Sequence, residues 1–148
     1  MDPLLNKAFE ARQRATAPYS RFFVGAAVRT ASGKIFTGSN VESSSYGLTL
    51  CAERLAICTA LHEGDHEITA IAVVADTRTA PGPCGACRQF MYDFAPTARV
   101  LMSNLDGDTR EVPVGDLLPW GFGPDDLVAF RARSDQDQTA EESEESTQ

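Results

Sequence analysis

Four cysteines are the side chains most able to do chemistry in this 148-residue chain, and two of them form its strongest local pattern. Cys84 and Cys87 are separated only by a glycine and an alanine. Residues three apart lie on nearly the same side of a helix, so both sulfurs could reach one tetrahedral metal ion. The pair alone leaves three alternatives open, namely a redox-active dithiol, half of a structural zinc site, or chance.

Cys51 can supply a third ligand, because we expect it at the start of a second core helix. Two helix N-termini that meet at one point would favour thiolates, since free N–H groups and helix dipoles stabilise negative charge there. Cys58 is seven residues further on, about 10 Å along that helix, so it cannot bind the same metal and is expected in the core. Three protein ligands with a vacant fourth position are typical of catalytic zinc. The sequence therefore predicts one zinc ion on Cys51, Cys84 and Cys87, with water in the fourth position.

Glu53 follows Cys51 by two residues and is therefore expected beside the metal. A carboxylate there can take a proton from water on the zinc and pass it to a leaving group. The plainer explanation is a first-turn glutamate favoured by the helix dipole. Three thiolates also give the site an excess negative charge, which weakens the effect of zinc on water. Arg54 and Arg88 are the candidates to offset that charge, although a surface role is an equal alternative for each.

Residues 62–66 read His-Glu-Gly-Asp-His and fit the HExxH pattern of zinc proteases. That mechanism needs both histidines on one face of a continuous helix. We expect the helix to end at Gly64, so the two histidines should lie at a solvated helix C-terminus and bind no metal.

The elements that must position these residues alternate along the chain. Apolar residues near helical spacing predict a helix over residues 3–15, and two further helices are expected over residues 48–64 and about 84–94. Runs of β-branched and apolar residues predict five strands, at residues 22–30, 34–41, 67–76, 98–105 and 109–114. The order predicts an α/β fold in which helices cover a mixed five-stranded sheet.

The acidic charge of the chain is concentrated at its end. Six acidic residues and no basic residue follow Arg133, although the whole chain has 21 acidic and 13 basic residues and a net charge of −8. We expect residues 134–148 to be a disordered tail, because they have no large apolar side chain to bury. Residues 1–133 form a nearly neutral domain without a basic stripe, which argues against a nucleic-acid partner. No apolar run is long enough for a membrane span, so we expect a cytoplasmic protein.

The cysteine motifs also resemble a known family. Cys51-Ala52-Glu53-Arg54, followed by Pro83-Cys84-Gly85-Ala86-Cys87-Arg88-Gln89, is similar to the small, tetrameric type of cytidine deaminase. The wider deaminase superfamily shares a ligand-x-Glu motif followed by P-C-x-x-C. Residues 18–27, 38–42 and 117–119 are also similar, and the resemblance runs from about residue 4 to 127. The chain departs from the family at Ser43, where an asparagine is common, in residues 46–50 and at Trp120.

The resemblance implies a three-layer α/β/α sandwich of the cytidine deaminase type. It implies hydrolytic deamination of cytidine and 2′-deoxycytidine to uridine and 2′-deoxyuridine, with release of ammonia, in pyrimidine salvage. Water activated by zinc would attack C4 of cytosine, while Glu53 would protonate N3 and then the leaving amine. Residues 1–133 would then be the catalytic domain, and the tail after Arg133 lies outside the resemblance.

The resemblance also assigns substrate-binding residues. Asn40 and Glu42 match positions that hydrogen-bond the ribose 3′-hydroxyl. Phe22 matches an aromatic residue that stacks on the pyrimidine, and Ala52 would offer backbone contacts to the base. Arg54 would temper the charge of the thiolates.

Two further residues match positions that act across a subunit boundary. Tyr46 and Phe122 correspond to residues that reach into the active site of a neighbouring subunit. The implied state is a homotetramer with shared active sites.

Two other functions stay open. The substrate could be another cytosine nucleoside, such as an aminoacyl-nucleoside antibiotic, although Asn40 with Glu42 favours a plain sugar. Nothing in the sequence is typical of a phosphate cradle, which disfavours a nucleotide. From a different class, the cysteines could form a structural zinc site in a binding protein, but such sites usually have four protein ligands and we find no fourth.

Overall fold

The computed structural model describes residues 1–145. Its elements follow the predicted order, with two short additions, a 3-10 turn and a helix directly after the last strand, and one long addition, a helix at the end. They are α1 (Pro3–Arg12), β1 (Val24–Thr30), β2 (Ile35–Ser39), a 3-10 turn (Tyr46–Leu48), α2 (Ala52–His62), β3 (Ile68–Ala75), α3 (Gly85–Phe94), β4 (Arg99–Ser103), β5 (Thr109–Pro113), α4 (Val114–Leu117) and α5 (Pro124–Glu145).

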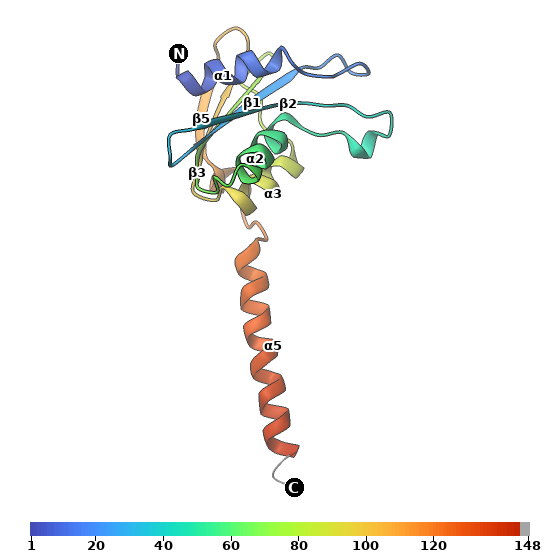
Figure 1. Ribbon diagram of the computed structural model, residues 1–148, viewed down its shortest axis with the longest axis vertical. Coiled ribbons are helices and arrows are strands. Elements are labelled where there is room, and N and C mark those ends of the chain that lie inside the picture. The colour runs from blue at the N-terminus through green and yellow to red at the C-terminus, as the bar shows by residue number, and fades with distance from the viewer. Residues whose placement is uncertain (146–148) are drawn as a thin grey trace.

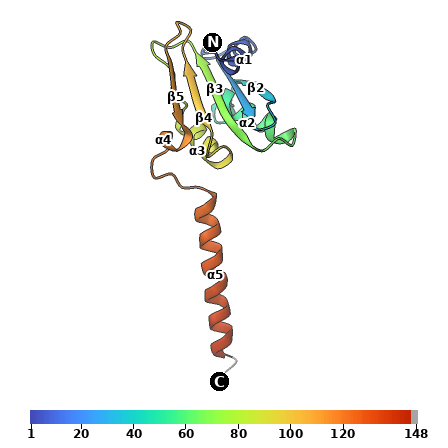
Figure 2. The same ribbon diagram turned by 90° about the vertical axis from the view of Figure 1, so that its left-hand side faces the viewer.

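The five strands form one mixed sheet in the order β2-β1-β3-β4-β5. Strands β3 and β4 are parallel, whereas the other three neighbouring pairs are antiparallel. Helix α1 covers one face of the sheet, and α2 and α3 cover the other (Figures 1 and 2). The predicted three-layer α/β/α sandwich with a mixed five-stranded sheet is therefore confirmed.

The central strand β3 is apolar on both sides because both sides are covered. Ile71 and Val73 pack with α2 and α3, whereas Ala72 and Val74 pack with α1. A strand buried on both faces reads as a continuous apolar run, not as an alternating one. This is why residues 67–76 could be recognised in the sequence as a buried strand.

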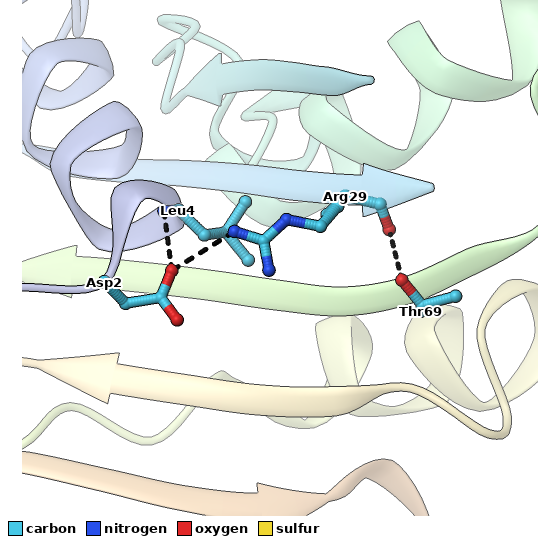
Figure 3. Close-up of polar contacts among 4 residues, drawn as sticks. All are labelled: Asp2, Leu4, Arg29 and Thr69. Atoms are coloured by element: carbon cyan, nitrogen blue, oxygen red, sulfur yellow. Dashed lines mark hydrogen bonds and ion pairs between the residues drawn. The ribbon is translucent and has the colours of Figure 1, made fainter. Parts of the chain in front are cut away.

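Helix α1 is fixed to β1 by a small polar cluster (Figure 3). The Asp2 Oδ1 atom accepts hydrogen bonds from the Leu4 backbone N–H, at 2.8 Å, and from Arg29 Nη2, at 3.2 Å. The Thr69 hydroxyl on β3 donates to the Arg29 carbonyl at 3.2 Å. The N-cap of α1, the end of β1 and the start of β3 are thus held together.

Two glycines let the helices lie close to the sheet. A Cβ at Gly25 would come within 2.0 Å of the Ala8 carbonyl oxygen in α1. A Cβ at Gly38 would come within 2.4 Å of the Ala52 carbonyl oxygen, in the first turn of α2. The second contact matters for function, because it places the start of α2 directly on β2.

The end of the chain differs from the sequence-based expectation. Residues 134–145, expected to be disordered, continue helix α5, which projects away from the body (Figure 1). The expectation considered only burial, whereas residues 124–145 contain no glycine, no internal proline and many strong helix formers. Asp125 and Asp126 also complement the helix dipole in its first turn. Residues 146–148 of the expected tail lie outside the described part of the chain.

The length of α5 does not make it a membrane span. Within residues 1–145, no helix is both long enough and apolar enough to cross a membrane.

Candidate zinc centre and substrate pocket

The structure brings the three predicted metal ligands together. Cys51 is the N-cap residue of α2, Cys84 is the N-cap residue of α3, and Cys87 lies in the first turn of α3. Their sulfur atoms all lie within 4.8 Å of one another, and the Cys51 and Cys84 sulfurs are 3.9 Å apart. Four ligands about 2.3 Å from a tetrahedral zinc ion would place sulfurs about 3.8 Å apart. The three thiols therefore fit a zinc ion.

The two helix starts explain why the sulfurs meet. Helices α2 and α3 pack against the same face of the sheet, and their first turns point to one place. Neither the Cys51 nor the Cys84 side chain caps its own helix by a hydrogen bond. Both sulfurs therefore stay available to a metal, while the helix N-termini favour their ionised form.

The thiol cluster ionises readily at Cys51. A hydrogen bond with Cys87 and the neighbouring Arg54 lower the pKa of the Cys51 thiol to about 5, although partial burial opposes them. The same hydrogen bond and burial raise the pKa of Cys87. Zinc binds thiolates and not thiols, so an ionised Cys51 favours metal binding at neutral pH.

Arg54 is the arginine that contacts a sulfur. Its Nη2 atom lies 3.6 Å from Cys51 Sγ and donates to the Thr49 carbonyl at 3.1 Å. Its Nε atom is buried, and among the described residues it has no hydrogen-bond partner. A partly buried cation this close to Cys51 is well placed to offset the negative charge of a thiolate cluster.

Arg88, the other candidate, has a different role in the structure. Its Nε atom donates to the Pro83 carbonyl at 2.7 Å, and its Nη1 atom donates to the Leu117 carbonyl at 3.3 Å. These contacts support the loop before Cys84. Of the two arginines, only Arg54 has a described hydrogen bond to a ligand sulfur.

Glu53 is buried beside the thiols, with 5% of its surface exposed. Burial raises the pKa of its carboxyl group to about 6, and the nearby charge of Cys51 adds to this effect. A group whose pKa lies near the working pH can both accept and donate a proton. Glu53 therefore has the properties of a proton carrier.

A pocket of about 370 Å³ opens onto this centre. Its volume lies in the usual range for small-molecule sites. Cys51, Cys84 and Glu53 line the pocket beside mostly apolar residues. The full lining consists of Phe22, Val24, Asn40, Thr49, Leu50, Cys51, Ala52, Glu53, Val73, Ala75, Thr77, Pro81, Gly82 and Cys84. Four sequence-predicted substrate and shuttle residues, Phe22, Asn40, Ala52 and Glu53, are thus found in one cavity.

Part of this wall was not expected from the sequence. Val73, Ala75 and Thr77 come from the C-terminal end of β3 and the loop after it. In α/β sheets, ligands bind beyond the carboxyl ends of parallel strands. The alternation of these three residues along the C-terminal end of the predicted buried strand was the signal that could have identified them.

Glu42 does not line this pocket. Its Oε1 atom accepts hydrogen bonds from the backbone N–H groups of Tyr19 and Ser20, both at 3.1 Å. It lines a neighbouring hollow of about 410 Å³ together with Tyr46. Thr49 lines both cavities, so the two are adjacent.

Tyr46 and Phe122 lie outside the main pocket of their own chain. Their side chains are exposed, at 76% for Tyr46 and 60% for Phe122. The Tyr46 ring packs edge-on against Tyr19, with the centroids 6.0 Å apart, but most of the Tyr46 and Phe122 side chains stays accessible to another molecule.

Two side predictions about α2 have different outcomes. The helix ends at His62, and Gly64 has a φ of +81°, so the HExxH pattern spans a helix end as predicted. Cys58, which was expected in the core, is instead exposed. Helix α2 buries the face that carries Ala56, Ile57 and Ala60, and Cys58 lies off that face.

Several known proteins are similar in sequence to this chain over most of its length. The family model of the cytidine and deoxycytidylate deaminase zinc-binding region matches residues 2–103. A cytidine deaminase from Halalkalibacterium halodurans is 48% identical over 125 residues, covering 84% of this chain and 95% of that protein. One from Sporosarcina psychrophila is 43% identical over 128 residues, covering 86% of this chain and 94% of that protein.

Solved structures agree with the sequence comparisons. A crystal structure of cytidine deaminase from Burkholderia pseudomallei is 51% identical and covers 80% of this chain and 96% of its own, with a TM-score of 0.79. The cytidine deaminase structure from Mycobacterium tuberculosis is 40% identical, with a TM-score of 0.70, and covers 81% of this chain and 94% of its own. The chain therefore belongs to the cytidine and deoxycytidylate deaminases, a family of zinc-binding enzymes.

Proposed function

We propose that the chain hydrolyses cytidine and 2′-deoxycytidine to uridine and 2′-deoxyuridine with release of ammonia, a step of pyrimidine salvage in the cytoplasm. The observation that carries this proposal is the buried Glu53 carboxyl group beside three clustered thiols, two of which, Cys51 and Cys84, line the same pocket as Glu53. The substrate class is supported by two relatives that match this chain over most of their length and are named cytidine deaminases. We assign the chemistry to residues 1–133.

Cys51, Cys84 and Cys87 would hold the zinc ion. When bound, zinc lowers the pKa of water and so supplies a nucleophile at neutral pH. Glu53 would accept a proton from the water whose oxygen bonds to C4 and would deliver it to N3 of the pyrimidine. It would then carry the remaining proton of that oxygen to the amine, so that the bond between C4 and the amine breaks, ammonia departs and a C4 carbonyl remains. Its raised pKa of about 6 suits both halves of this transfer.

Residues of this pocket and of the adjacent hollow that Glu42 lines would orient the nucleoside. Phe22 would stack on the pyrimidine, and the backbone of Ala52 would contact the base. The Asn40 amide and the Glu42 carboxylate would hydrogen-bond the ribose 3′-hydroxyl, because each has hydrogen-bonding capacity beyond its contacts within the chain. The substrate would thus be held from the base to the sugar.

Glu53→Gln tests the proposed chemistry, since it keeps the size of the side chain and removes its ability to carry a proton. We expect kcat on cytidine to fall by about 10²- to 10⁴-fold while the zinc content of the purified protein stays at one per chain. The measurement is the absorbance change on conversion to uridine, with metal analysis of the same samples. Glu63→Gln, an exposed position just after α2, is the matched control and should be fully active.

Three outcomes would contradict the proposal. Full activity of Glu53→Gln would remove Glu53 from the reaction. Zinc binding with a wild type that is inert on every cytosine nucleoside tried would indicate a structural metal. Activity on an aminoacyl-cytosine nucleoside but not on cytidine would leave the chemistry intact and overturn the substrate.

Arg54→Met tests the charge-balancing role proposed for Arg54. In protein stripped of zinc by a chelator, we expect the pKa of Cys51 to rise above its value of about 5, because the neighbouring positive charge is lost. The measurement is the pH dependence of Cys51 alkylation, followed by mass spectrometry of the peptide. Arg88→Met is the control, since its guanidinium contacts backbone carbonyls. An unchanged Cys51 profile in Arg54→Met would contradict this role.

We also propose a homotetramer whose active sites are shared between subunits. Exposed aromatic side chains at Tyr46, Trp120 and Phe122 support it, because large exposed apolar groups commonly mark interfaces.

Phe122→Ala tests this assembly. We expect kcat/KM to fall about 10-fold or more with zinc content unchanged. Mixing Phe122→Ala with Glu53→Gln subunits should restore part of the activity, because some sites then combine an intact Glu53 with an intact Phe122 of a neighbour. A mixture no more active than its components, or a monomer by analytical ultracentrifugation, would contradict the shared site.

A further inference from the structure

The segment that carries Phe22 to the pocket is irregular. Residues 19–23 belong to no helix or strand and lead directly into β1. Arg21, next to Phe22, has a φ of 54°, a left-handed conformation that is uncommon for a residue with a side chain. Phe22 itself is 44% exposed at the pocket wall. Such a segment needs contacts from elsewhere to hold one conformation.

Asn40, the residue directly after β2, provides two of these contacts. Its Oδ1 atom accepts a hydrogen bond from the Val24 backbone N–H at 2.9 Å. Its Nδ2 atom donates to the Phe22 carbonyl at 2.8 Å. Asn40 is 8% exposed, so these bonds form largely away from water, where an unmade hydrogen bond is costly.

Glu42 holds the other end of the same segment. Its Oε1 atom accepts from the N–H groups of Tyr19 and Ser20, and the Ser20 hydroxyl in turn accepts from the Phe22 N–H at 3.0 Å. Hydrogen bonds from the Ser20 side chain and backbone keep the pKa of Glu42 below its ordinary value. The carboxylate therefore stays ionised at neutral pH and keeps accepting the hydrogen bonds from Tyr19 and Ser20.

We propose that Asn40 and Glu42 form a backbone clamp that positions Phe22 for stacking on the pyrimidine, in addition to any contact with the sugar. The clamp consists of four hydrogen bonds from these two side chains to the backbone of residues 19–24. The inference rests on the proposed function, in which Phe22 meets the base. Both residues are positioning residues in this role, because they act on the substrate through Phe22.

The clamp predicts a result that a contact with the ribose does not. If Asn40 only bound the 3′-hydroxyl, its loss would make no difference to a substrate that lacks this group. If it positions Phe22, its loss impairs base stacking whether or not the hydroxyl is present.

The first test compares Asn40→Ala with wild type on cytidine and on 3′-deoxycytidine. We expect kcat/KM on 3′-deoxycytidine to fall about 10- to 100-fold, the value of roughly two hydrogen bonds. On cytidine it should fall by at least the same factor, because the proposed contact with the 3′-hydroxyl is lost as well. On 3′-deoxycytidine, Asn40→Ala in a Phe22→Ala background should lower kcat/KM little further, because there is no ring left to position. Ser39→Ala, at the adjacent buried position, is the control. Equal kcat/KM of Asn40→Ala and wild type on 3′-deoxycytidine would overturn the clamp.

A second measurement needs no substrate. Amide hydrogen exchange over residues 19–24 should be at least about 10-fold faster in Asn40→Ala than in wild type, because the Val24 N–H loses its acceptor. Unchanged exchange would overturn the clamp even if the chain deaminates cytidine. A wild type inert on cytidine, with exchange that still responds to Asn40→Ala, would instead contradict only the proposed function.

Discussion

The meeting of two helix N-termini on one face of the sheet is the constraint on which the site depends. Cys51 and Cys84 each begin a helix, and Cys87 adds a third sulfur from the first turn of α3. Each thiolate repels the next, so the cluster needs positive charge around it. The two helix dipoles and Arg54 supply that charge.

The packing of the helices on the sheet holds this meeting point in position. Gly38 lets the start of α2 rest on β2, and the apolar strand β3 accepts helices on both of its faces. The end of β3 then forms the wall of the pocket that opens onto the thiols. The same burial that packs α2 raises the pKa of Glu53, so the fold also prepares the group proposed to carry the proton.

The Cys84–Cys87 pair and the central strand β3 were predictable from the sequence because both follow from short-range patterns. Cysteine spacing on a helical turn and the apolar run of β3 need no knowledge of distant contacts. Cys58 was misplaced because the sequence shows where α2 lies but not which face it buries. The helix beyond residue 134 was missed because burial was weighed and local helix propensity was not.

The orientation of Asn40 and Glu42 could not be predicted for a different reason. Their side chains bind the backbone of a segment about twenty residues earlier in the chain, and only the folded structure brings the two together. Family resemblance points to the sugar, whereas the geometry adds a contact with the residues that carry Phe22. A residue's role in the family and its role in holding the fold can thus coincide at one side chain.

Zinc X-ray absorption spectroscopy tests the central claim most directly, because it counts the atoms bound to the metal. Three sulfur neighbours at about 2.3 Å and one lighter atom at about 2.0 Å are predicted for the purified protein. Cys58→Ser should leave this spectrum unchanged, and Cys84→Ser should remove one sulfur or the zinc itself. Four sulfur neighbours would indicate a closed structural site, and zinc without sulfur neighbours would place the metal elsewhere, so either result would contradict an open three-thiolate centre.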